Sequence, residues 1–557
     1  MTRQALIINI TRMGDLVQTG PLIARLHEEW RDAAVDLVVD RSFALMASLL
    51  PGVRQVFAFD FQGLIDQTRT MAKDVVALSR ELSAWVSPLR TVRYDRVVNL
   101  TFNKRSALLA AYLDAPDIRG ATATADGACV IRNPWLSYFT DLHHYRRFNR
   151  FNLVDLYALG GSGVGAHQPL TLTVTQDALD WADGFLHSKG MTAMRIAVQV
   201  GASDPMKAWR PEYVGRAMAE ISRRIPAVFV LIGTKGEAPA VRQAVASYRA
   251  AGGTHPLCDA VDHTNLSQLA ALLARCRLLL SNDTGPMHIA VAAGTPVLDL
   301  SVGHVDYNET GPYGAGHWAV QPDLECAPCG FDQVCAHQAC KDRLIPEQVA
   351  LLALCMLDVG PFPSDFRGVR VYESGIDADG LSCWNLRAGQ EDRATQWYGT
   401  FWRRFWYETF TGQKSHIAPC DGPPPDAIQT AALFDRLASA LETLSRQADQ
   451  IVRLSGRSSL QTEALQKAQS QLNHTHQQAI GIAFPSCALG PVSVACMRDL
   501  KNIDAEGLLP MARQQAHAFR VWRERVMVVM QRLQSTSGGK AGAHALRSLA
   551  VLKLKTF

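Results

Sequence analysis

The chain has 557 residues and a net charge of +4, with 48% hydrophobic and 19% charged residues. This length exceeds what one hydrophobic core supports, so about three domains are expected. The hydrophobic share excludes an intrinsically disordered chain. The weak positive charge argues against nucleic-acid binding, which needs a concentrated basic surface.

The sequence predicts a cytoplasmic location. No uninterrupted apolar run reaches the roughly 18 residues of a membrane-spanning helix, and the apolar run at residues 5–10 is too short for a signal peptide. The mild positive charge is compatible with a peripheral contact to an anionic inner-membrane surface.

Residues 1–165 are predicted to form an α/β domain. Runs rich in Val, Ile and Leu at residues 5–10, 35–39 and 96–100 are each followed by a helical pattern. Such alternation predicts a parallel sheet with helices on both faces. The glycine-rich stretch 159–165 is predicted to be a hinge.

Residues 166–358 are predicted to form a second domain of the same kind. The expected strands are 195–200, 228–232, 278–281 and 297–300, with helical patterns between them. Two such domains joined by a hinge leave a cleft at the carboxyl ends of both sheets, where ligands bind in open α/β folds.

Residues 359–557 are predicted to form a helical extension of unknown role. Aromatic side chains recur there at helical spacing, and we expect them to form a core more readily than a sugar-binding platform. These are Trp397, Phe401, Trp402, Phe405 and Trp406. A seam of apolar residues at alternating spacings of four and three follows, and it could mediate self-association or pack on its own domain. The seam consists of Leu437, Leu441, Leu444, Ala448 and Ile451.

The turn after the first strand carries an acidic candidate, Asp15, in Arg12-Met13-Gly14-Asp15. One interpretation is a helix N-cap. The other is a carboxylate at the mouth of the cleft that accepts a proton from an attacking hydroxyl.

Two turns in the second domain are candidate anion sites. Residues 281–288 lead from a buried strand into a helix that begins at Gly285-Pro286, and the first backbone N–H groups of a helix bind anions. The loop after the strand 195–200 contains Ser203 and Lys207, and Lys207 could supply a point charge for a phosphate. An ordinary capped turn and a solvated lysine are the alternatives. Because each turn follows the carboxyl end of a strand, we expect them to face one cleft.

These motifs together resemble glycosyltransferase family 9, the heptosyltransferases, over residues 3–355. The resemblance rests on Arg12-Met13-Gly14-Asp15, on Gly201-Ala202-Ser203 with Lys207-Ala208-Trp209, and on the stretch from Asn282 to Val297. It implies a GT-B fold of two Rossmann-like domains, a nucleotide-sugar donor such as ADP-heptose and inversion at the anomeric carbon.

The resemblance also implies roles for individual residues. Asp15 would be the general base, and the donor would be bound by Ser203, Lys207, Glu237, Asp283, Thr284, Gly285 and His288. Arg105, His144 and Arg146 would contact an anionic acceptor such as the lipopolysaccharide core. Catalysis would be independent of metal, because a lysine and a helix N-terminus would stabilise the leaving diphosphate.

Four cysteines gather after the second predicted sheet, at Cys326, Cys329, Cys335 and Cys340. Four thiolates can bind zinc or iron tetrahedrally, so a structural metal is one interpretation and a reduced, packed loop is the other.

Other functions remain open at this stage. The helical extension lies outside the family pattern, so the acceptor could be a protein. The chain could also be a GT-B epimerase, or a catalytically silent scaffold that binds nucleotide sugars.

Overall fold

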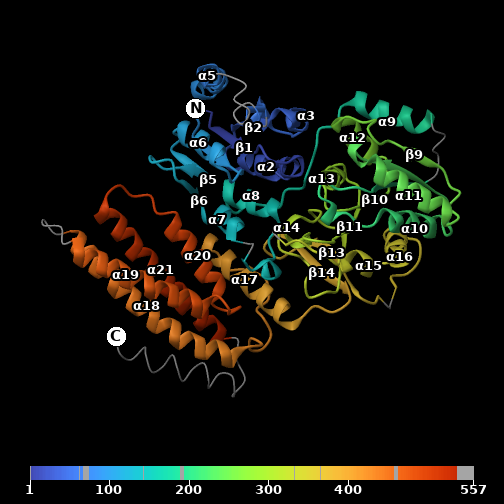
Figure 1. Ribbon diagram of the computed structural model, residues 1–557. Helices are drawn as coiled ribbons and strands as arrows, with labels where there is room; N and C mark the ends of the chain where they lie inside the picture. The colour runs from blue at the N-terminus through green and yellow to red at the C-terminus, as the bar shows by residue number, and fades with distance from the viewer. Residues whose placement is uncertain are drawn as a thin grey trace. The chain divides into compact units, whose positions relative to one another are not determined.

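The computed structural model describes residues 2–61, 63–64, 66, 75–141, 144–188, 194–331, 333–363, 366–456 and 462–535 (Figure 1). The chain divides into two compact units. The first consists of Met1–Ala121 and Phe151–Glu391, and the second of Thr122–Arg150 and Asp392–Phe557. In the part of the chain that the structure describes, no helix is long and apolar enough to cross a membrane.

The first lobe of unit 1 is built on a parallel sheet with the strand order β3-β2-β1-β4-β5. The strands are β1 (Gln4–Ile8), β2 (Ala34–Asp40), β3 (Val53–Phe59), β4 (Arg96–Asn99) and β5 (Asp117–Ala123). Strand β1 is central, and Ala5, Leu6, Ile7 and Ile8 are fully buried. Strand order reverses beside β1, and ligands bind at such a point.

The helices of this lobe connect its strands and follow them in the chain. They are α1 (Met13–Val17), α2 (Gly20–Glu29), α3 (Ala44–Ser48), α5 (Val75–Thr91), α6 (Lys104–Tyr112) and α8 (Leu153–Gly161). All nine residues of α8 are buried, so this helix lies inside unit 1.

The second lobe of unit 1 has a mixed sheet with the order β14-β13-β12-β11-β10-β7-β8-β9. Six strands are parallel: β7 (Met194–Gln199), β8 (Ala227–Ile232), β9 (Leu257–Asp259), β10 (Leu278–Ser281), β11 (Val297–Leu300) and β12 (Trp318–Pro322). An antiparallel hairpin, β13 (Val369–Ile376) and β14 (Ser382–Ala388), extends the sheet beyond β12.

Helices alternate with these parallel strands. They are α9 (Gln176–Ser188), α10 (Pro211–Ser222), α11 (Ala238–Ala250), α12 (Leu266–Leu273), α13 (Gly285–Ala292), α14 (Tyr307–Thr310), α15 (Ala339–Arg343) and α16 (Pro346–Met356). Short 3₁₀ turns precede α10 and α11, at Pro205–Lys207 and Lys235–Glu237.

Unit 2 is mainly helical and includes a short stretch from the first half of the chain. Its elements are β6 (Cys129–Arg132), α7 (Pro134–Asp141), α17 (Arg393–Thr411), α18 (Ala427–Ser455), α19 (Thr462–Ala483), α20 (Gly490–Lys501) and α21 (Leu508–Ser535). Helix α18 packs against both α19 and α21 (Figure 1).

The predicted fold class is confirmed: two Rossmann-like lobes are followed by a helical extension. The predicted hinge is displaced, because Leu159, Gly160 and Gly161 lie buried in the last turn of α8, and the connection to the second lobe begins at Ser162. The antiparallel hairpin was not predicted. It belongs to the second sheet, so the structure divides the chain at Glu391, whereas the sequence predicted a boundary at residue 358.

The apolar seam of α18 packs within its own unit. All five of its predicted residues are buried, with exposed fractions of 0–3%. The aromatic stripe of α17 is buried as well, at 6% or less for each residue, which confirms the prediction of a core.

Candidate active site

The first part of the candidate site is the turn from β1 into α1, which places Asp15 in the first turn of that helix. The backbone carbonyl of Asp15 accepts hydrogen bonds from Asn9 Nδ2 at 3.1 Å and Thr19 Oγ1 at 3.0 Å. The N-cap position of α1 belongs to Arg12, so Asp15 is not the N-cap residue that one interpretation of the sequence expected.

The second part of the site consists of the turns after β7 and β10, which are neighbouring strands. Asn282 joins the two turns, because its Nδ2 donates to the carbonyl of Val200 at 3.0 Å and its Oδ1 accepts from Trp209 N at 2.9 Å. Lys207 and Asp283 are thereby brought together, with 3.4 Å between Lys207 Nζ and Asp283 Oδ2.

Asp283 is a buried carboxylate with several stabilising partners. Besides Lys207, the hydroxyl of Thr310 donates to Asp283 Oδ2 at 2.7 Å. Burial by itself would raise the pKa of Asp283, but Lys207, His288 and the Thr310 hydrogen bond lower it below the usual value. Asp283 is therefore ionised at neutral pH and pairs with Lys207.

Helix α13 begins at this cluster and points its amino end to it. Thr284 is the N-cap residue, and Gly285 and Pro286 open the helix. The first backbone N–H groups of a helix have no partners within the helix, and the helix dipole favours an anion there. His288, one turn along, is 4% exposed. Burial lowers the pKa of its imidazole to about 4, so His288 is neutral at physiological pH.

The two lobes approach each other closely at α1 and α13. A Cβ added to Gly14 would lie 3.0 Å from His288 Cδ2, and one added to Gly285 would lie 2.3 Å from Met13 Cε. A larger residue at Gly14 would press on the His288 ring, and one at Gly285 would displace the end of the Met13 side chain. The glycines therefore allow the turn that carries Asp15 to meet the turn that carries Asp283.

Asp15 has the electrostatic character of a base. Burial raises the pKa of its carboxyl to about 6; Asp283 adds to this rise, and Arg12 and Lys207 oppose it. These mutual influences show that Asp15, Lys207 and Asp283 share one environment. A carboxylate with a pKa near 6 is mostly ionised at neutral pH and accepts a proton more readily than an ordinary aspartate.

The other predicted donor residues lie at the same edge of the second sheet, in different surroundings. Glu237 closes the 3₁₀ turn after β8, where Oε2 accepts from Thr234 N at 2.7 Å and Oε1 accepts from Gln199 Nε2 at 2.6 Å. Ser203 is exposed in the loop after β7. Glu237 is thus held against the carboxyl end of β7, and Ser203 is open to solvent.

The predicted acceptor residues divide between the two units. Arg105 is exposed in the first turn of α6, after β4, and β4 is the neighbour of β1. His144 and Arg146 belong to unit 2. The His144 ring meets Phe484 edge-on at 5.7 Å, and Arg146 is only 8% exposed. Within unit 2, His144 is therefore exposed beside Phe484 and Arg146 is buried, and their role in acceptor binding stays a prediction.

The four cysteines do not form a metal site in this structure. Among the described residues, no group of three or more His, Cys, Asp or Glu side chains could hold a metal ion. Cys329 and Cys340 are buried, Cys326 is exposed, and Cys335 Sγ accepts a hydrogen bond from Gln338 N at 3.3 Å. Cys326 and Cys335 are thus not enclosed with the two buried thiols, and the four side chains do not gather into one group.

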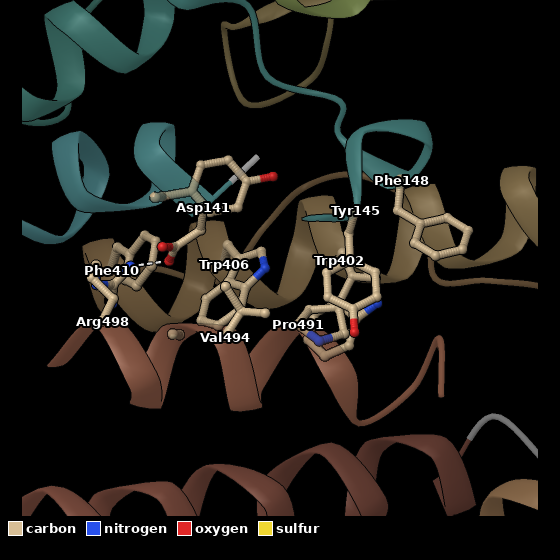
Figure 2. A pocket seen from close by; sticks show the side chains of 11 residues that line it. Asp141, Tyr145, Phe148, Trp402, Trp406, Phe410, Pro491, Val494 and Arg498 are labelled. Carbon is tan, nitrogen blue, oxygen red and sulfur yellow. Dashed lines mark hydrogen bonds and ion pairs between the residues drawn. The ribbon is translucent and has the colours of Figure 1, made fainter. Parts of the chain in front are cut away.

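Unit 2 contains a small cavity, and Figure 2 shows the residues that line it. It measures about 30 Å³ and is enclosed by aromatic residues such as Tyr138, Trp402 and Trp406. At its edge, the carboxyl of Asp141 pairs with Arg498. A space of this size has room for a few water molecules at most, so the cavity belongs to the packed core and does not fit a sugar.

The sequence did not single out two residues that interact with Asp283. Thr310 lies 27 residues from Asp283 in a turn with no catalytic signature, and only the fold brings them into contact. Asp299, in β11, is fully buried; its Oδ2 accepts from Ser301 Oγ at 2.5 Å, and Oδ1 has no hydrogen-bond partner among the described residues. Burial raises the pKa of Asp299 to about 8, with a further rise from Asp283. An aspartate inside an apolar strand could have been noted as unusual.

Comparison with known proteins found a matching family model. The model of glycosyltransferase family 9 (heptosyltransferase) matches residues 83–340, a region that is similar to that family. Lipopolysaccharide heptosyltransferase 3 of Escherichia coli K12 is 25% identical over 289 residues, which are 52% of this chain and 79% of that protein. Lipopolysaccharide heptosyltransferase 1 of Pseudomonas aeruginosa is 24% identical over 362 residues, which are 64% of this chain and 95% of that protein.

A solved structure also resembles the family 9 region. Escherichia coli ADP-heptose lipopolysaccharide heptosyltransferase II has 17% sequence identity and a TM-score of 0.46, covering 64% of this chain and 99% of that one. The matching family model and these relatives support a glycosyltransferase.

Proposed function

We propose that the protein transfers a heptose, or a related sugar, from ADP-heptose to a hydroxyl of a lipopolysaccharide core acceptor, with inversion at the anomeric carbon. The observation that carries this proposal is the meeting of Asp15 with the Lys207–Asp283 pair at the N-terminus of α13. A base on one side and a cationic, dipolar anion site on the other are what a direct displacement requires.

In the proposed reaction, the acceptor hydroxyl attacks the anomeric carbon and gives its proton to the Asp15 carboxylate. The bond between the anomeric carbon and the diphosphate oxygen breaks, and ADP leaves with the electron pair. Negative charge grows on the diphosphate, where Lys207 and the backbone N–H groups at Thr284 and Gly285 stabilise it. Neutral His288 can donate one hydrogen bond to the same group. These groups supply the stabilisation without a metal ion.

Substitution of the base tests the proposal most simply. Asp15→Asn keeps the shape of the side chain but cannot accept the proton, so kcat should fall by about 10²- to 10⁴-fold. The affinity for ADP, measured by titration calorimetry, should change little. ADP release from ADP-heptose is the activity assay, with lipopolysaccharide core and protein acceptors compared. Near-normal turnover by Asp15→Asn would contradict the assignment of the base.

A further inference from the structure

A short segment of the second lobe, Thr310–Tyr313, connects the donor cluster to the buried helix α8. Thr310 is the last residue of α14, and Gly311, Pro312 and Tyr313 follow it with buried side chains or backbone. No motif in the sequence assigns a role to this segment.

On the donor side, Thr310 and Lys207 share one atom of Asp283. The Thr310 hydroxyl donates to Asp283 Oδ2 at 2.7 Å, and Lys207 Nζ lies 3.4 Å from the same oxygen. The shorter contact is therefore the one from Thr310. A lysine held loosely by its carboxylate partner keeps donor capacity for a second anion.

On the other side, α8 and its N-cap residue hold the segment through two hydrogen bonds, and a third fixes Asp155 itself. Asn152, the N-cap of α8, donates from Nδ2 to the Gly311 carbonyl at 3.2 Å. The Tyr313 hydroxyl donates to Asp155 Oδ1 at 2.9 Å, and Asp155 Oδ2 accepts from Ser382 N at 2.9 Å. Asp155 is fully buried and Tyr313 is 2% exposed, so these bonds are shielded from solvent.

Helix α8 also reaches the base. Tyr157, two residues after Asp155, is 2% exposed. Burial raises the pKa of its hydroxyl well above the usual value, and the negative charge of Asp15 raises it further. Tyr157 thus lies in the environment of Asp15. One helix therefore borders the base and, through residues 310–313, supports the partner of the donor lysine.

We propose that Thr310 is a positioning residue for the sugar donor: anchored to α8 through Gly311 and Tyr313, it holds Asp283 so that Lys207 remains available to the diphosphate. The inference rests on the proposed donor site. Without the Thr310 hydroxyl, Asp283 would lose its nearest hydrogen-bond donor in a buried place and would take a closer pairing with Lys207 instead. The lysine would then be less available to the diphosphate.

The direct test is Thr310→Val, which removes the hydroxyl at nearly constant volume. Because a hydrogen bond to a charged group is lost, we expect the Kd for ADP to rise about 10- to 100-fold. The KM for donor should rise with it, whereas the KM for acceptor should stay unchanged. Thr310→Ser, which restores a hydroxyl, should recover most of the affinity. A purely structural role of Thr310 would not raise the KM for donor while leaving the KM for acceptor unchanged.

A second variant tests the anchor. Tyr313 does not contact Asp283, yet Tyr313→Phe should weaken ADP binding about 3- to 10-fold, because it frees the segment that carries Thr310. Tyr248→Phe is the matched control, since Tyr248 is a buried tyrosine of the same lobe whose hydroxyl reaches a backbone carbonyl, that of His255, at 3.4 Å. The control should bind ADP normally. In the double variant Thr310→Val/Tyr313→Phe, the two effects should be less than additive.

The outcomes separate the inference from the proposed function. If the unaltered protein binds ADP and Thr310→Val, folded by its thermal transition, binds it equally well, the positioning role is wrong while the donor assignment stands. Equal losses in Tyr313→Phe and Tyr248→Phe would likewise overturn the anchor. Failure of the unaltered protein to bind ADP would overturn both the donor assignment and the inference.

Discussion

Two carboxylates, the buried Asp283 in the second lobe of unit 1 and the half-buried Asp141 in the helical unit, each pair with a cation but differ in protonation. The pKa of Asp283 is lowered because Lys207, His288 and Thr310 outweigh the effect of burial. The pKa of Asp141 is raised to about 7 by burial, although Arg498 opposes the rise. Arg498 also pairs with Asp499 at 2.8 Å, so its charge is shared between two acids.

The comparison shows that neighbouring groups, and not burial alone, set the pKa of each carboxyl. A lysine and a hydrogen-bond donor next to one carboxylate keep it ionised. Burial and the negative charge of that carboxylate then raise the pKa of another acid nearby. In the proposed active site Asp283 is the ionised partner, and Asp15, whose pKa is raised to about 6, is the neighbour that can exchange a proton near neutral pH. In the helical unit, burial likewise raises the pKa of Asp141.

The largest expected effect follows from removing the cation of the first pair. Lys207→Met keeps much of the side-chain volume but deletes the charge, so stabilisation of the leaving diphosphate is lost. We expect kcat/KM for ADP-heptose to fall about 10²- to 10³-fold, as for the loss of one transition-state donor. Lys235→Met is the control, because Lys235 is exposed on the same lobe in the turn after β8. Similar losses in both variants would contradict a specific role for Lys207.

A second prediction concerns Asp299, whose pKa is raised to about 8 chiefly by burial. The folded state then binds a proton that the unfolded state releases near pH 4. Proton binding to Asp299 therefore adds to the free energy of unfolding. The addition is complete below pH 4 and is lost as the pH rises to about 8. Asp299→Asn, a permanently neutral substitute, should remove that part of the pH dependence. Chemical unfolding at pH 5, 7 and 8.5 measures it, and an unchanged pH dependence would show that Asp299 is ionised throughout.

The smallest effect is expected at Asp141, which is better hydrated than Asp299 and has Arg498 beside it. Its raised pKa means that its contribution to stability is complete below about pH 4 and declines as the pH approaches 7. Hydrogen-exchange protection of α7 and α20, corrected for intrinsic rates, should decrease from pH 5 to 8 in the unaltered protein and stay constant in Asp141→Asn. Asp449→Asn, which breaks an ion pair in which both side chains are 48% exposed, should behave like the unaltered protein. The same decrease in Asp141→Asn would contradict the assignment.

Local patterns in the sequence predicted much of the fold and the centre of the site. Short apolar runs such as Ala5-Leu6-Ile7-Ile8 predict buried strands. In open α/β folds, the turns that follow parallel strands lie at one edge of the sheet. For this reason Asp15, Lys207, Asp283 and His288 could be grouped before any coordinates. Their grouping depends on strand order, which the family pattern implied.

Long-range packing explains what the sequence could not predict. His144 and Arg146 belong to the helical unit, where the His144 ring contacts Phe484, more than 300 positions away in the chain. Thr310 looks like an ordinary turn residue, and its hydroxyl matters only because α14 lies beside Asp283. The glycine-rich stretch 159–165 suggested a hinge, but Gly160 and Gly161 end a buried helix, where small size rather than flexibility suits the packing.

The pH dependence of turnover tests the central claim most directly. With ADP-heptose below its KM and a saturating lipopolysaccharide core acceptor, log kcat/KM for ADP release should rise with a slope of one through an apparent pKa of about 6 and level off by pH 7.5. In Asp15→Asn this rise should disappear along with most of the rate. A rate that is constant between pH 5 and 7.5, or the same rise in Asp15→Asn, would contradict Asp15 as the base.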